Sequence, residues 1–113
     1  MAVRVDRNAA IDRRQGADAV ADAVADAAAI VSSMRAEGLD PQRWGNGPGD
    51  RYGWHEHGYH KVLYCLSGSI VFHTREQGDV ELSPGDRLEI DPGTEHAATV
   101  GPAGVECAEA ATP

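Results

Sequence analysis

The feature that most constrains this chain is the alternation of short β-prone runs with glycine- or proline-containing breaks after residue 51. Tight turns favour these residues because glycine reaches positive φ and proline presets φ near −65°. The runs predict strands at 52–56, 59–66, 69–74, 79–82, 86–90, 96–100 and 104–110. Short strands separated by closely spaced turns are typical of a β-sandwich or a small barrel.

Alternation within two runs predicts which faces are buried. In 86–90, Leu88 and Ile90 alternate with charged residues, so both should point inward. In 59–66, apolar side chains occur on both faces, with Leu63 on one and Tyr64 on the other. A small barrel hides only its inner face, so the N-terminal helix or a second subunit should cover the outside. We therefore predict a homodimer.

We predict that the whole chain is a single domain and that one helix precedes the strands. Residues 1–16 form an N-terminal arm, either loose or a short strand that pairs only if a partner is present. Residues 17–38 are alanine-rich, which predicts a helix that stops at Gly38. Residues 39–113 form the β domain. Three aspartates of the helix lie four residues apart and suggest either a cation site or, as we favour, a solvated face: Asp18, Asp22 and Asp26.

Composition excludes some partners. Eighteen acidic against ten basic residues give a net charge of −8, which argues against nucleic acid or an anionic membrane as partner. The N-terminal residues are too charged for a signal peptide, and no apolar run approaches the ~20 residues of a membrane span. We therefore expect a cytoplasmic protein. Cys65 and Cys107 are expected to be reduced thiols in the core rather than a disulfide scaffold.

Three histidines and one lysine are the candidate metal-binding and catalytic residues. His55 and His57 are two residues apart, so on a strand they face the same way, and Lys61 follows on that face if no bulge intervenes. Imidazole suits Zn, Fe, Ni, Mn or Cu. Two rings with a third from a distant strand would leave open positions on the metal, as a catalytic site needs.

The spacing of these residues resembles that of a known family. The run from Gly49 to Gly68, with His55-Glu56-His57 and Lys61 inside it, is similar to the first motif of small single-domain cupins. The run from Gly85 to His96, with Asp91-Pro92-Gly93, is similar to their second motif. The resemblance covers about residues 44–110. It implies a mostly β chain, a cupin jelly-roll β-barrel preceded by one α-helix, with a divalent transition metal (Zn, Fe, Mn or Ni) held by His55, His57 and His96.

Lys61 departs from the family pattern, because cupins carry a metal-binding glutamate at that position. A cation ~3 to 5 Å from a divalent metal is costly, so Lys61 swings away, is neutral, or no metal binds. A neutral lysine could act as a general base or Schiff-base amine, and a charged one could hold a substrate carboxylate over the metal. A site of three histidines remains workable.

Other polar and aromatic residues near the motifs have less specific expectations. Strand parity places four of them on the surface or behind the ligands: His60, His73, Glu56 and Glu95. Tyr52 and Trp54 could wall the mouth of the pocket, or they could simply pack there.

The sequence therefore favours a metalloenzyme that acts on a small molecule, as a dioxygenase, isomerase, lyase or cyclase. In this hypothesis His55, His57 and His96 hold the metal, and Lys61 is the catalytic acid, base or anion anchor. The alternative is a non-catalytic module that binds a small ligand or a metal as a sensor or regulator. A purely structural barrel ranks last.

Overall fold

The computed structural model describes residues 3–7 and 27–112. Their elements in chain order are β1 (Val3–Asp6), α2 (Ala27–Ala36), β2 (Gln42–Asn46), β3 (Arg51–His55), β4 (His60–Thr74), β5 (Gly78–Leu82), β6 (Arg87–Ile90) and β7 (His96–Thr112). The prediction of a mostly β chain with one helix near its N-terminus is confirmed for these residues. No helix among them is both long and apolar enough to cross a membrane.

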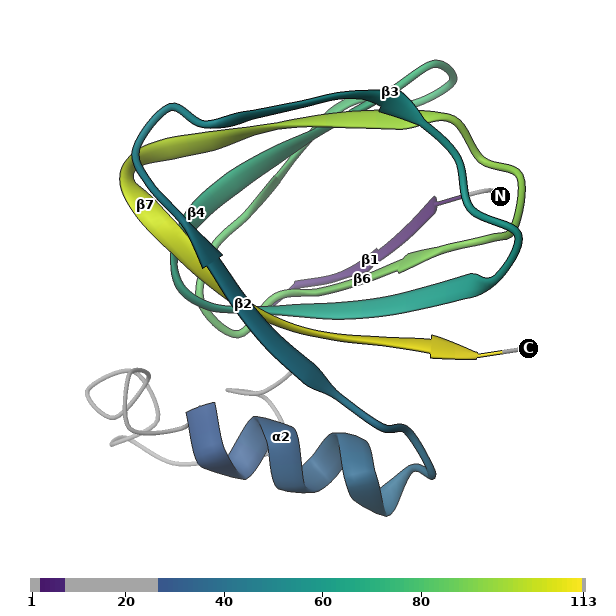
Figure 1. Cartoon of the computed structure of the whole chain (residues 1–113), viewed down its shortest axis with the longest axis vertical. Helices are drawn as coiled ribbons and strands as arrows, with labels where there is room; N and C mark the ends of the chain where they lie inside the picture. The colour runs from purple at the N-terminus through teal and green to yellow at the C-terminus, as the bar shows by residue number, and fades with distance from the viewer. Residues whose placement is uncertain (1–2, 8–26, 113) are drawn as a thin grey trace.

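Two long strands, β4 and β7, organise the sheet. They pair antiparallel along most of their length, from His60 opposite Thr112 to Thr74 opposite His96. The first half of β4 also pairs with β6, and the second half pairs with β5. The second half of β7 pairs with β2, and the first half pairs with β3. Figure 1 shows both strands curving around a common interior, so that each contributes to both layers of a sandwich.

Both long strands turn the corner between the layers at a pair of glycines. The register between β4 and β7 shifts on either side of Gly68, and residues 101–104 of β7 lie in the gap. Gly68 and Gly104 have φ of 72° and 80°, a region that glycine enters without steric cost. The breaks predicted at 67–68 and 101–104 are therefore bends within continuous strands. The four segments predicted on either side of them form only two strands.

The predicted cupin jelly roll is present, but its described strands do not close into a barrel. The hydrogen-bonded path runs β1-β6-β4-β7-β2, with β3 and β5 attached as branches, and no pairing joins its two ends among the described strands. The layers are linked through the bends of β4 and β7, and apolar side chains between the layers hold the open edges together. The fold is a cupin-type jelly roll in the form of an open sandwich.

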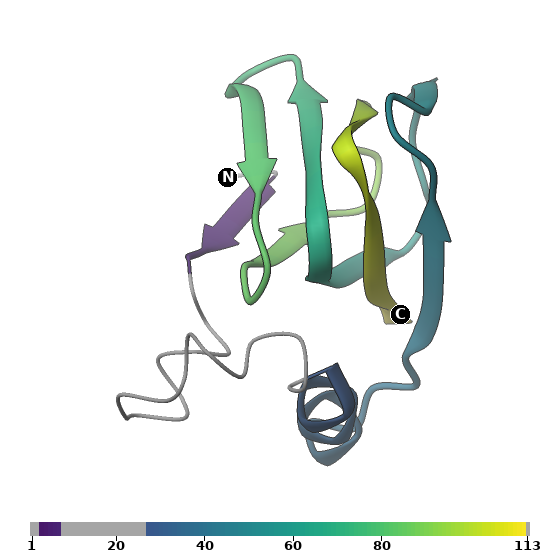
Figure 2. The ribbon, with the colours of Figure 1, turned by 90° about the vertical axis from the view of Figure 1, so that its left-hand side faces the viewer.

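Two apolar clusters explain why the first half of β4 lacks alternation. Leu63 faces the interior of the sandwich with Leu88 and Ile90, as predicted. Tyr64 faces outward and is nevertheless buried, because Met34 and its apolar neighbours on α2 cover it. Figures 1 and 2 both place α2 outside the sheet, against this face. The helix is thus the element predicted to cover the outside, and a second subunit is not needed for that purpose.

The described residues include only part of the predicted helix and of the predicted N-terminal arm. α2 ends before Gly38, whose φ is 88° and whose N–H donates to the Arg35 carbonyl at 2.9 Å, in agreement with the predicted stop. The three aspartates lie outside the described residues. In the arm, Val3–Asp6 pairs with β6 of the same chain, from Val3 opposite Ile90 to Asp6 opposite Arg87. The homodimer stays a prediction.

Candidate metal centre

The three predicted histidines converge at one end of the cavity between the layers. His55 ends β3 and pairs in register with His96, which begins β7. His57 lies in the following loop, where its carbonyl accepts a 2.8 Å hydrogen bond from the N–H of Gly93. This bond ties the two predicted motifs together. The ring centroids are 4.4 Å apart for His55 and His96 and 4.8 Å apart for His55 and His57.

The donor atoms of these rings fit a metal ion. One nitrogen from each histidine lies within 4.8 Å of the other two. The Nδ1 of His55 donates to the Gly53 carbonyl at 2.6 Å, and the Nδ1 of His96 donates to the Thr94 carbonyl at 2.9 Å. A carbonyl only accepts, so each Nε2 is left with a lone pair. The Nε2 atoms of His57 and His96 are buried and have no hydrogen-bond partner within the described part of the chain, and a metal would satisfy them.

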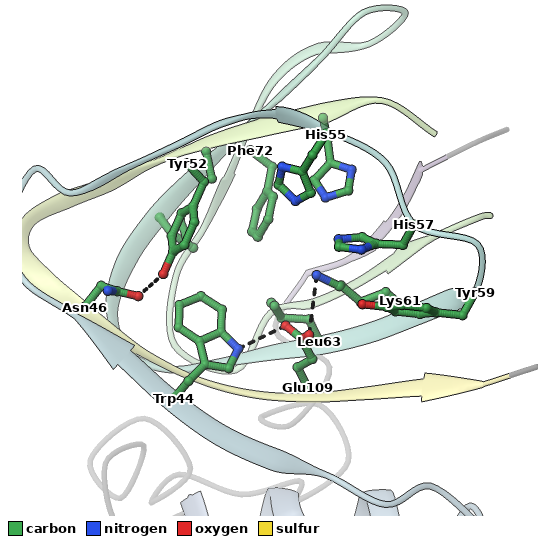
Figure 3. Close-up of a pocket in the computed structure, with 13 residues that line it drawn as sticks. Trp44, Asn46, Tyr52, His55, His57, Tyr59, Lys61, Leu63, Phe72 and Glu109 are labelled. Carbon is green, nitrogen blue, oxygen red and sulfur yellow. Dashed lines mark hydrogen bonds and ion pairs between the residues drawn. The ribbon is translucent and has the colours of Figure 1, made fainter. Parts of the chain in front are cut away.

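Lys61 lines the same cavity, as predicted, and it is paired with an acid that the sequence analysis missed. Its side chain is 9% exposed, and its Nζ lies 3.4 Å from Oε2 of Glu109 on β7. The other oxygen of Glu109 accepts a 3.0 Å hydrogen bond from Nε1 of Trp44. Figure 3 shows the Lys61 ammonium between Glu109 and the histidines. Among the described residues the candidate metal group holds three histidines and no carboxylate.

The cavity has a volume of about 340 Å³ and an aromatic wall opposite the histidines. Trp44 and Tyr52 meet edge to face, with ring centroids 6.0 Å apart. The Tyr52 hydroxyl donates to Oδ1 of Asn46, and the Trp44 indole donates to Glu109. The polar hydrogens of both rings therefore have hydrogen-bond acceptors. Figure 3 shows this wall facing the open space of the cavity. Its aromatic rings offer contact area to a ligand.

Trp44 and Glu109 could have been found from strand parity. Glu109 has the same parity on β7 as Cys107, which is buried in the core between the layers. Trp44 is the register partner of Cys107 on β2. Parity within one strand therefore indicates Glu109, whereas Trp44 also requires the register of β2 with β7, which local pattern does not specify.

The remaining predicted residues lie away from the cavity. His60 pairs with Glu89 at 2.9 Å on the outer side of β4, and His73 pairs with Asp79 at 2.7 Å. Glu95 pairs with Arg75 at 3.1 Å, and Glu56 is exposed. Trp54 is 43% exposed, with the Arg75 guanidinium 3.6 Å from its ring centroid, so only Tyr52 of the predicted aromatic pair lines the cavity.

The cysteines occupy structural positions. Cys65 and Cys107 are free, fully buried and opposite one another in register. A hydrogen bond with Cys65 and burial both raise the pKa of the Cys107 thiol. A protonated, inaccessible thiol is a poor nucleophile, so the prediction of reduced core thiols fits the structure.

Burial of the histidine rings makes the stability of the protein depend on pH. Burial lowers the pKa of His96 and of His57 below the ordinary 6.5, and the charge of Lys61 acts in the same direction. The hydrogen bond to the Thr94 carbonyl opposes this change in His96, and the charge of Glu109 opposes it in His57. Below about pH 6.5 the unfolded chain therefore binds more protons than the native protein. The stability that the neutral rings contribute is complete above this value and is lost as the pH falls through the lowered native pKa.

We expect the free energy of unfolding of the metal-free protein to decrease between about pH 6.5 and pH 5. Urea unfolding of EDTA-treated protein across this range measures the slope. A His96→Gln variant should show a flatter profile, because glutamine does not titrate. Equal slopes in both proteins would show that these histidines do not cause the pH dependence.

The comparisons with known proteins agree with this fold. Residues 44–103 match the family described as "Cupin domain" (Cupin_2), so the chain belongs to this family. No curated protein sequence matches the chain. The matched segment includes all three histidines and Lys61.

Solved structures show the same fold. A chain from "Crystal structures of DMSP lyases RdDddP and RnDddQII" is 30% identical with a TM-score of 0.57 over 65% of this chain. The DMSP lyase DddQ from Ruegeria pomeroyi DSS-3 is 20% identical with a TM-score of 0.62 over 66% of this chain. An uncharacterized double-stranded β-helix protein from Klebsiella pneumoniae is 24% identical with a TM-score of 0.58 over 65%. The matches span 36%, 38% and 65% of those chains, respectively.

Proposed function

We propose that this protein is a metal-dependent cupin enzyme that acts on a small molecule. The observation that carries the proposal is the pair of buried, unpartnered Nε2 atoms on His57 and His96, next to a third histidine. A structural role would give these atoms a hydrogen-bond partner, because leaving a buried polar atom unpaired costs about 1–3 kcal/mol. A divalent transition metal such as Zn, Fe, Mn or Ni accounts for all three rings.

The residues around the histidine cluster have different roles in this proposal. His55, His57 and His96 would hold the metal, which when bound supplies a Lewis acid with open positions. Lys61 is the nearest candidate for a catalytic side chain, since it lines the same cavity and its ammonium can donate a proton or hold an anion. The aromatic wall of Trp44 and Tyr52 offers apolar contact area to the substrate. Dioxygenase, isomerase, lyase and cyclase reactions all suit such a site.

Reconstitution with single metals tests the proposal. Metal-free protein is loaded separately with Zn, Fe, Mn or Ni and incubated with small acids, neutral compounds and amines, and proton NMR follows their conversion. DMSP belongs in this panel because of the 30% identical chain from a lyase study. We expect one metal form to turn over a compound, and Lys61→Met to slow that reaction about 100-fold. Turnover that persists in a His57→Ala/His96→Ala variant would contradict the proposal.

A second candidate is a non-catalytic module that binds a small ligand or a metal. The Lys61–Glu109 ion pair favours it, because the position of the usual glutamate ligand carries a cation. One metal per chain with tight ligand binding and no turnover in any metal form would support this candidate. A cytoplasmic location and a homodimer remain predictions under either candidate.

A further inference from the structure

The charges of the cavity decide which ligand it favours. Among the described residues that line it, only Lys61 and Glu109 carry a formal charge at neutral pH, and they form an ion pair. The three histidines are neutral ligands, so a divalent metal at their centre would keep its full charge of +2. The other charged side chains of residues 3–7 and 27–112 do not line the cavity, and exposed charges are screened beyond about 8 Å at physiological ionic strength. The loaded cavity is therefore positive.

The two charged side chains also differ in the hydrogen-bonding groups that they leave available to a ligand. Both oxygens of Glu109 are engaged, one by Lys61 and one by Trp44. Lys61 has three N–H donors, and a single Glu109 oxygen lies near its Nζ, at 3.4 Å. Lys61 is also the more buried of the two, with 9% of its side chain exposed against 25% for Glu109. The lysine, held by Glu109, thus offers free donors on the histidine side of the cavity.

We propose that the cavity takes a small organic carboxylate. Its anionic group lies beside Lys61 and the histidine centre, and its planar or apolar body lies against Trp44 and Tyr52. This inference rests on the proposed function, since it names the substrate class of the same site. Where the family has a negatively charged residue that binds the metal, this chain has Lys61, which provides a hydrogen-bond donor for the carboxylate of the bound molecule. Glu109 is a positioning residue that orients the lysine and the indole together.

An aromatic wall with a nearby carboxylate is also how proteins bind organic cations. Two observations argue against that occupant here. The Glu109 carboxylate is already paired with the Lys61 ammonium, which offsets its charge, and that ammonium lies in the same cavity and would repel a cation. A cation remains an outcome that the experiment can detect.

Benzoate, benzamide and benzyltrimethylammonium are suitable probes, because each carries an aromatic ring that fits a cavity of about 340 Å³. The chain has two tryptophans, so a Trp54→Phe background makes Trp44, in the cavity wall, the sole tryptophan reporter. Emission titrations use EDTA-treated protein, and parallel samples are loaded with zinc. Metal stoichiometry is measured on the same samples. A failure of metal binding is therefore distinguished from a failure of ligand selectivity.

We expect benzoate to bind about 10-fold or more tightly than benzamide, because a charge-assisted hydrogen bond is worth about 1.5–3 kcal/mol. Lys61→Met should abolish this preference. Glu109→Gln should instead increase benzoate affinity, because it removes the negative charge beside the lysine. Opposite effects from two variants in one ion pair cannot arise from general unfolding. The proposal is overturned if benzoate does not bind, if benzamide or the cation binds equally well or better, or if the preference survives Lys61→Met.

Discussion

Zinc or cobalt is expected to raise the Tm of the EDTA-treated protein by about 10 °C at roughly 100-fold excess over the Kd. Such an excess stabilises the native state by about 2.7 kcal/mol, and each kcal/mol shifts the Tm of a domain this size by about 4 °C or more. A His57→Ala/His96→Ala variant should lose the shift completely, because only the His55 imidazole remains from the group. Differential scanning calorimetry measures the effect.

The matched control removes two histidines outside the cavity. His60 and His73 bind acidic partners elsewhere on the sheet, so a His60→Gln/His73→Gln variant should keep the full metal-induced shift. Its Tm without metal should fall only slightly. If both double variants lose the shift, or neither does, the metal does not bind where the structure places the histidine cluster.

A Gly68→Ala variant is expected to lose about 3 kcal/mol or more of its free energy of unfolding. Gly68 has a φ of 72°, and a Cβ atom there would overlap the backbone carbonyl of Gly104 where β4 and β7 turn the corner. Backbone atoms of a neighbouring strand cannot move aside without bending that strand as well. The cost of the left-handed conformation, about 1–2 kcal/mol, is added to the overlap.

Gly78→Ala is the control for this effect, with urea unfolding as the measurement. Gly78 has nearly the same φ, 73°, but a Cβ there would meet nothing within 4 Å. It should therefore lose only the conformational cost of about 1–2 kcal/mol. Equal losses in the two variants would show that the contact between Gly68 and Gly104 does not limit the stability of the corner.

Local spacing was sufficient to predict the histidine centre. His55 and His57 are separated by one residue, and the turn at Asp91-Pro92-Gly93 places His96 at the start of the opposing strand. Lys61 has the same parity on β4 as Leu63, which faces the interior, so its face follows from its own strand even though a loop separates it from His55 and His57. These features depend on a few neighbouring residues, so one sequence contains the information.

Long-range pairing could not be predicted in the same way. The partner of Lys61 is 48 positions further along the chain, and only the register of β4 with β7 brings Glu109 to it. The glycines at 68 and 104 were read as strand ends because a turn and a bend have the same local composition. Whether the jelly roll closes into a barrel could not be predicted either, because closure depends on pairings between sheet edges that local pattern does not specify.

Elemental analysis of untagged protein as purified tests the central claim, a metal held by His55, His57 and His96, most directly. The account predicts about one transition-metal ion per chain, given three protein ligands with open positions, and almost none in the His57→Ala/His96→Ala variant. Iron rather than zinc would direct assays toward oxygen chemistry. No metal in either sample, and none taken up from added Zn, Mn, Fe, Co or Ni, would contradict the account.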